Sequence, residues 1–263
     1  MEKFFKWTAW PMTQPQSYGV FHLTFTFVGL AVVILLAFLL RKLSNKQNRI
    51  LLLCIGLFLL VMEIYKQLFY FYVYGGGQDW TWWIFPFQLC SVPMYLCIFC
   101  GFCKSERINS VLYDFMFAFN FIGGVITFTE PSGINHPYWT LTLHAYIWHM
   151  LLIFLGVYLF WSKRACVSWK GYLKSLSVLG VCVLIAQIIN VSLQGIDGTT
   201  MFFISPYAPN NLPFFSGIYA NYGWIVNMIL FVLALVLAGG ICYYLFYLFR
   251  ILHEKQKQKK QTS

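Results

Sequence analysis

The chain has 263 residues, of which 60% are hydrophobic, 21% are aromatic and only 10% are charged. Soluble domains carry about 25% charged residues, and no soluble core hides this much apolar surface, so a soluble globular protein is excluded. The formal net charge is +10, but the basic residues fall between apolar stretches and form no stripe on a soluble domain, so we expect no nucleic-acid partner. The composition predicts an integral membrane protein, with aromatic rings at the membrane interfaces.

A membrane-spanning helix needs about 20 apolar residues, and the sequence holds seven such stretches. In chain order they are 17–40, 49–73, 86–103, 108–128, 138–161, 173–194 and 222–249. The third is short for a full crossing and contains Pro93, so we expect it to be tilted, kinked or partly re-entrant. The fold class we predict is an all-α polytopic membrane protein, a bundle of about seven transmembrane helices forming one domain over residues 1–250.

The basic residues fall in alternate connections. Fifteen of the 18 Lys and Arg lie in or beside the first, third and fifth connections and the C-terminal tail, and the other three connections hold none. By the positive-inside rule the C-terminus is cytoplasmic and the N-terminus lies outside. We expect a multi-pass protein of the cell (plasma) membrane, with residues 251–263 as a disordered basic tail.

The three outer connections, residues 74–85, 129–137 and 195–221, are rich in aromatic residues, glycine and proline. Loops of this composition either cap a cavity that opens outward or anchor the bundle at the interface, and the sequence leaves both interpretations open.

Polar side chains inside the apolar stretches are costly and therefore informative. Glu63 and Lys66 stand three residues apart, so they share one face of the second helix and are expected to pair, with Lys66 reaching toward the outer surface. Asn120 and Asn190 serve as interhelical hydrogen-bonding groups or line a polar pocket. The same two interpretations apply to three further polar residues, Asp114, Gln187 and Asn227.

His144 and His149 lie on the fifth helix, five residues apart. Their rings are separated by about 140° around the axis, so they are not expected to bind one metal ion together. The run Cys97, Cys100 and Cys103 also drifts around a helix and is surrounded by apolar residues. We therefore predict no metal site and no cofactor.

Cys90 is set in the segment Phe85-Pro86-Phe87-Gln88-Leu89-Cys90-Ser91-Val92-Pro93, at the outer start of the third helix. The positive end of a helix dipole lowers the pKa of a nearby thiol. A cysteine with a histidine as base is one arrangement for acyl transfer, although the sequence does not show that the two side chains meet.

Several segments together resemble one family. They are Glu63, the Gln88-Leu89-Cys90-Ser91 segment, Asn120 with the following Gly123-Gly124, Trp148-His149-Met150, and Asn190 followed by Met201-Phe202-Phe203 and Pro206. The chain resembles the YwaF family of bacterial membrane proteins, related to the animal transmembrane protein 164, an ether-phospholipid acyltransferase. Gln88 stands where that family usually has histidine.

The resemblance implies a lipid acyltransferase or transacylase in which Cys90 is the nucleophile and His149 the base, with His144 as a second candidate base. Glu63, Gln88, Asn120 and Asn190 would bind or orient the substrate, a membrane phospholipid or lysophospholipid. The alternative from the residues themselves is a small-solute or proton-coupled transporter with an outward-facing polar cavity. A scaffold without chemistry is a third class, and the sequence does not give the oligomeric state.

Overall fold

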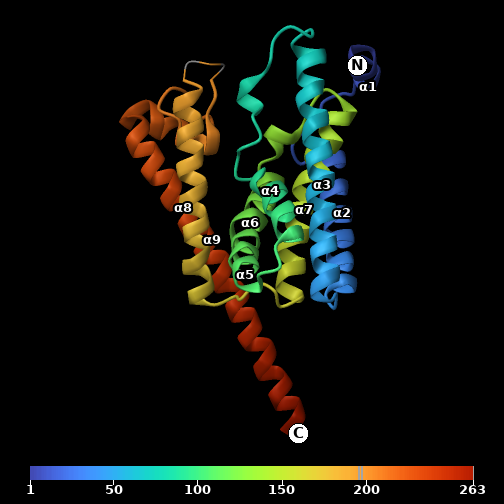
Figure 1. The fold of residues 1–263 in the computed structure, drawn as a ribbon, viewed down its shortest axis with the longest axis vertical. Helices are drawn as coiled ribbons and strands as arrows, with labels where there is room; N and C mark the ends of the chain where they lie inside the picture. Colours follow the sequence, from blue (N-terminus) through green and yellow to red (C-terminus); the bar gives the residue numbers. More distant parts are fainter. Residues whose placement is uncertain (195, 197, 263) are drawn as a thin grey trace.

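The computed structural model describes residues 1–194, 196 and 198–262 (Figure 1). This part of the chain is helical, and its only β-type pairing is one isolated bridge between Pro11 and Tyr138. Its α-helices are α1 Glu2–Thr8, α2 Val20–Leu40, α3 Asn45–Phe69, α4 Val92–Phe102, α5 Glu106–Phe115, α6 Phe121–Thr129, α7 Trp139–Trp161, α8 Trp169–Ser192 and α9 Phe215–Thr262. Two π-helical segments extend them: η1, Tyr70–Tyr74, follows α3, and η3, Met116–Asn120, joins α5 to α6.

The predicted all-α polytopic fold is confirmed. Six helical stretches within the described residues are long and apolar enough to cross a membrane: Val20–Leu40, Asn45–Tyr74, Glu106–Thr129, Trp139–Trp161, Trp169–Ser192 and Phe215–Leu252. The third predicted crossing is the exception, because its helix α4 has only 11 residues and follows a non-helical segment. The two termini lie at opposite ends of the bundle, as seven passes require (Figure 1).

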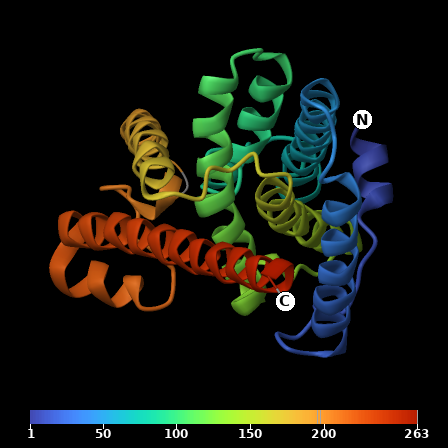
Figure 2. The same cartoon turned by 90° about the horizontal axis from the view of Figure 1, so that it is seen from below.

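α7 forms the centre of the bundle, where it packs against α2, α6 and η3. The tightest neighbouring pair is α3 and α4, and α5 packs against α8. Seen from below, α2 and α3 lie on one side of α7 and α8 lies on the far side of the α4–α6 group. α9 runs from the side of α8 to the middle of the bundle, where it packs against η3 (Figure 2). The outward faces of α2, α8 and α9 carry exposed large apolar side chains, as expected for surfaces that meet lipid.

Serine caps begin three of the helices at one end of the bundle. The Ser44 side chain accepts from the Gln47 amide and Gln47 reaches back in a capping box, which starts α3. The Ser105 and Ser168 side chains accept from the Ile108 and Gly171 amides and so cap α5 and α8. We call this end, which carries most of the Lys and Arg residues, the basic end, and the opposite one the outer end. Which side of a membrane each faces stays the prediction of the positive-inside rule.

The last helix differs from its predicted limits. α9 begins at Phe215, before the expected residue 222, and contains a kink at Gly223, whose φ of 78° glycine adopts without strain. α9 then continues to Thr262 and extends below the bundle (Figure 1). The expected disorder of residues 251–263 stays a prediction.

The longest outer connection folds inward. Its short 3-10 helix η5, Met201–Phe203, is followed by further buried residues that include Ile204, Ser205 and Asn210. Phe202 and Phe203 both have positive φ, at 53° and 54°, which costs about 1–3 kcal/mol at each non-glycine residue. This segment therefore needs strong contacts to hold it, and those contacts surround Cys90.

Candidate functional site

Side chains from several elements hold the backbone around Cys90, in residues 84–91, which we call the Cys90 turn. Trp148 on α7 donates from Nε1 to the Cys90 carbonyl over 2.9 Å. Asn120 at the end of η3 donates from Nδ2 to the Leu89 carbonyl over 2.7 Å. Gln67 on α3 donates to the Ile84 carbonyl over 2.8 Å. The Cys90 turn is thus fixed from three sides before the outer loop is considered.

The fourth attachment is Gln88, which uses both ends of its amide. Its Nε2 donates to the Thr200 carbonyl and its Oε1 accepts from the Phe202 amide, each over 2.8 Å. The rings of Phe87 and Phe202 lie 5.9 Å apart between centroids. The inward-folded outer loop therefore lies directly on the Cys90 turn, which places it as a cap over the turn.

Asn190, at the outer end of α8, holds the same loop from the other side. Its Nδ2 donates to the Met201 carbonyl over 3.1 Å, and its Oδ1 accepts from the Met201 amide over 2.6 Å. Both Asn190 and Met201 are almost fully buried. Gln88 and Asn190 thus each use both ends of the amide on backbone groups, an arrangement that orients the site.

The predicted pair of Glu63 and Lys66 is present. The Lys66 ammonium lies 3.0 Å from Glu63 Oε1, which also accepts from Gln67 Nε2 over 2.7 Å. Glu63 is only 3% exposed, and its second oxygen, Oε2, is buried with no hydrogen-bond partner among the described residues. A charge buried in this way is costly, so the free oxygen marks a position where a polar ligand atom or a water molecule would be stabilised.

The two histidines differ in what their rings contact. His149 Nδ1 lies 2.7 Å from the Ala145 carbonyl, which can only accept, so Nδ1 carries the proton and Nε2 keeps a free lone pair. The ring of His144 stacks on Trp148 at 5.5 Å, and its Nε2 is buried with no partner in the part of the chain that the structure describes. Both rings therefore retain a nitrogen that can act as a base.

The Cys90 sulfur itself is half-buried and bonds to neither His149 nor His144 within the described chain. The turn that carries it lies outside the long spanning helices. Burial raises the pKa of this thiol, the charge of Lys66 opposes the rise, and that of Glu63 adds to it. Desolvation is the largest effect, so this pKa is raised and not lowered as the position near a helix start led us to expect. A base is therefore needed to form the thiolate.

Two polar groups around the Cys90 turn were not singled out from the sequence. Gln67 stands four residues after Glu63, a spacing that places both on one helical face and could have identified it. Trp148 was part of the recognised segment, but its indole donor to the Cys90 carbonyl was not anticipated.

The wider polar set does not form one pocket. Asp114 accepts from the Cys166 amide over 2.6 Å at the basic end, far along the chain from the Cys90 turn. Asn227 instead supports the outer loop, accepting from Asn210 and donating to the Phe203 carbonyl, each over 3.4 Å. For Asp114 and Asn227 the interpretation as local hydrogen-bonding groups is the better one, whereas Gln187 Oε1 is buried without a partner among the described residues.

The pH dependence of Cys90 alkylation gives a direct check of this environment. In protein whose other thiols are replaced, the rate of reaction with a small neutral alkylating reagent should rise with pH to a midpoint above about 8.5, the value of an unperturbed thiol. The reason is the sign of the shift: a raised pKa keeps the thiol protonated, and so unreactive, to higher pH. Lys66→Gln should move the midpoint higher still, because the opposing charge is lost. A midpoint below that of a free thiol would contradict this description.

The sequence matches the model of the TMEM164 family over residues 15–260. No curated protein and no solved structure matches the chain.

Proposed function

We propose, because this chain belongs to the TMEM164 family of membrane proteins, that it transfers acyl chains between phospholipids and lysophospholipids, with Cys90 as nucleophile. The substrates would be lipids of the cell membrane in which the bundle is embedded. The acyltransferase activity is the one that the resemblance of the Cys90 and His149 segments implies.

One observation carries the proposal. Gln67, Asn120 and Trp148 all hydrogen-bond to backbone carbonyls of the Cys90 turn, while the thiol itself is left without a bond to any of them. A backbone fixed around a thiol whose side-chain hydrogen bond is to its neighbour Ser91 is an arrangement expected of a positioned nucleophile, because orientation lowers the entropic part of the barrier. His149 is the next residue on α7, and its Nδ1 bond to the Ala145 carbonyl leaves Nε2 as the nitrogen that would serve as base.

The proposed reaction has two balanced steps. In the first, His149 Nε2 accepts the thiol proton, Cys90 Sγ attacks the ester carbonyl, and the carbon–oxygen bond to the leaving lysolipid breaks as that oxygen takes the proton back. In the second, His149 accepts the proton of an incoming lysolipid hydroxyl, whose oxygen attacks the thioester, and the released sulfur regains the proton. No other reactant is consumed.

The charged neighbours have a defined role in this scheme. The Lys66 ammonium, already near the thiol, favours the thiolate and the oxyanion of the tetrahedral intermediate. Glu63 holds Lys66 and Gln67 in place through Oε1. Its unpartnered Oε2 is available to a substrate hydroxyl.

The test uses the full chain reconstituted in liposomes that contain a phospholipid with a labelled acyl chain and an acceptor lysophospholipid. Cys90→Ala should abolish transfer, because no nucleophile remains, and His149→Ala should lower it by about 10²–10⁴-fold. Cys54→Ala is the matched control, since Cys54 is exposed on α3 and should leave the rate unchanged.

Transfer that survives Cys90→Ala at the Cys54→Ala rate would overturn the proposal. Solute uptake that survives Cys90→Ala but is lost in Glu63→Gln would instead establish the transporter, because the free and buried carboxylate oxygen is the group that such a cavity would use.

A further inference from the structure

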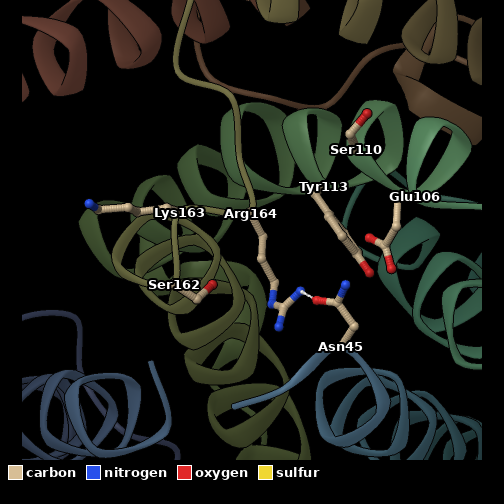
Figure 3. Close-up of a pocket in the computed structure, with 7 residues that line it drawn as sticks. All are labelled: Asn45, Glu106, Ser110, Tyr113, Ser162, Lys163 and Arg164. Atoms are coloured by element: carbon tan, nitrogen blue, oxygen red, sulfur yellow. Dashed lines mark hydrogen bonds between the residues drawn. The ribbon is translucent and has the colours of Figure 1, made fainter. Parts of the chain in front are cut away.

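A cavity lies at the basic end, opposite the Cys90 turn. It has a volume of about 360 Å³ and lies between the starts of α3 and α5 and the connection from α7 to α8 (Figure 3). Its lining residues are Asn45, Glu106, Ser110, Tyr113, Ser162, Lys163 and Arg164. This volume is within the range of small-ligand sites, and the lining is polar, which distinguishes it from a gap between lipid-facing helices.

A buried hydroxyl in this lining has a hydrogen to donate. Tyr158 donates to Asn48 Oδ1 over 2.8 Å, and Asn48 in turn donates from Nδ2 to the Tyr113 hydroxyl over 2.9 Å. Tyr113 is thus an acceptor in this chain of bonds, and its own O–H has no acceptor among the described residues. Tyr113 is only 2% exposed, and a buried donor without an acceptor is unfavourable. A ligand that places an acceptor atom beside this hydroxyl would therefore be stabilised.

Arg164 supplies a second unused donor. Its two terminal nitrogens donate to Asn45 Oδ1 and the Leu43 carbonyl, each over 2.7 Å, which fixes the guanidinium against the start of α3. Among the described residues its Nε is buried without a partner of good hydrogen-bond geometry, and the guanidinium also interacts with the Tyr158 hydroxyl. A fixed guanidinium with free N–H groups is the arrangement that binds phosphate oxygens, and it loses little side-chain entropy on doing so.

Glu106 adds the opposite charge to the same cavity. Its carboxylate is exposed and makes no ion pair with Arg164 or Lys163, since the ion pairs within the described ranges are Lys6–Glu2 and Lys66–Glu63. In Figure 3 the Glu106 carboxylate and the Tyr113 hydroxyl point toward the side where Arg164 meets Asn45, while the Lys163 ammonium points away. The cavity thus presents a cationic wall and an anionic wall that do not neutralise each other.

We propose that this cavity binds a zwitterionic headgroup that joins a phosphate to a primary ammonium, the headgroup of an aminophospholipid in the leaflet at the basic end. Arg164 and the Tyr113 hydroxyl take the phosphate oxygens, and Glu106 takes the ammonium. A simple anion would meet the Glu106 charge, and a simple cation would meet Arg164, so a ligand with both charges fits the two walls best. The site is separate from the proposed acyl transfer at the outer end and does not depend on it.

The experiment measures the binding of soluble short-chain probes to the purified full chain in detergent. The probes are dihexanoyl phosphatidylethanolamine, dihexanoyl phosphatidylglycerol without an ammonium, free phosphoethanolamine and inorganic phosphate. The wild-type chain should bind the ethanolamine lipid most tightly. Glu106→Gln should lower the affinity for the ethanolamine lipid by roughly threefold to tenfold, because the ammonium contact is removed. The affinity for the glycerol lipid should stay the same or increase.

Two further variants separate the cavity from general surface charge. Tyr113→Phe should lower the affinity for both lipid probes by about tenfold, because it removes one hydrogen bond to a charged oxygen. Lys163→Gln is the matched control for a lost positive charge, since its ammonium points away from the other polar groups, and it should change little. Thermal unfolding of each variant verifies that it is folded, and Glu106 is exposed.

Three results would overturn the proposal. One is equal affinity of wild-type and Glu106→Gln protein for the ethanolamine lipid. Another is a loss of lipid affinity in Lys163→Gln as large as the loss in Tyr113→Phe, which would indicate attraction by surface charge alone. The third is binding of free phosphoethanolamine as tight as that of the lipid, which would make the ligand a soluble molecule.

Discussion

Asn190→Leu should destabilise the protein by roughly 2–6 kcal/mol, because it leaves two buried backbone groups without partners at about 1–3 kcal/mol each. The groups are the amide and the carbonyl of Met201, which both bond to the Asn190 side chain. Leucine has a similar size, so the loss reports hydrogen bonding and not a cavity. Interhelical hydrogen bonds in membranes contribute only about 0.6 kcal/mol on average. That value does not include the cost of leaving the other hydrogen-bonding group buried and unpaired.

The loop that Asn190 holds makes the effect larger. Phe202 and Phe203 keep their positive φ only while the surrounding contacts impose it. Without Asn190 the remaining amide clamp is Gln88, so we expect faster hydrogen exchange at residues 200–203 and at the Cys90 turn.

Asn221→Leu is the matched control, and unfolding in detergent is the measurement. Asn221 is exposed on α9 and bonds only to the Gly217 carbonyl one turn before it, so its loss should change stability by no more than about 0.5 kcal/mol. If Asn190→Leu lowers the free energy of unfolding no more than Asn221→Leu does, the Asn190–Met201 hydrogen bonds are not what holds the loop.

The sequence predicted the bundle because hydropathy acts locally. Each apolar stretch forms a helix on its own in lipid, so the crossings could be located within several residues. The pairing of Glu63 with Lys66 was also predictable, since three-residue spacing on a helix fixes it.

The contacts that shape the site could not be predicted in this way, because they join distant segments. Gln88 meets Thr200 and Phe202 more than 110 residues later, and nothing local to either segment specifies that pairing. The same holds for Asn120, whose place on the π-helix η3 aims it at the Leu89 carbonyl. Their polarity inside apolar stretches indicated a role, but only the folded structure showed that they hydrogen-bond to backbone groups of distant segments.

Gly56→Ala should have the second large effect, because α3 and α4 meet at this glycine. A Cβ added there would lie 2.7 Å from both the backbone nitrogen and Cγ1 of Ile98 on α4, and 3.1 Å from Cys97 Cβ. A backbone atom cannot turn aside as a flexible side chain does, so the helices must separate, at about 1–3 kcal/mol for one methyl group. Small residues at such crossings are what allows close helix packing in lipid.

Separating the helices also moves the site. α4 continues directly from the Cys90 turn, while Glu63 lies about two helical turns beyond Gly56 on α3, so a wider crossing draws the thiol away from Glu63 and Lys66. We therefore expect Gly56→Ala to unfold at a lower temperature and, if Cys90 is the nucleophile, to lose acyl transfer beyond what the lower stability explains. Gly180→Ala on α8 is the control, since nothing lies within 4 Å of the added Cβ and alanine favours the helix. Equal unfolding temperatures for the two variants would show that the α3–α4 crossing is not close-packed at Gly56.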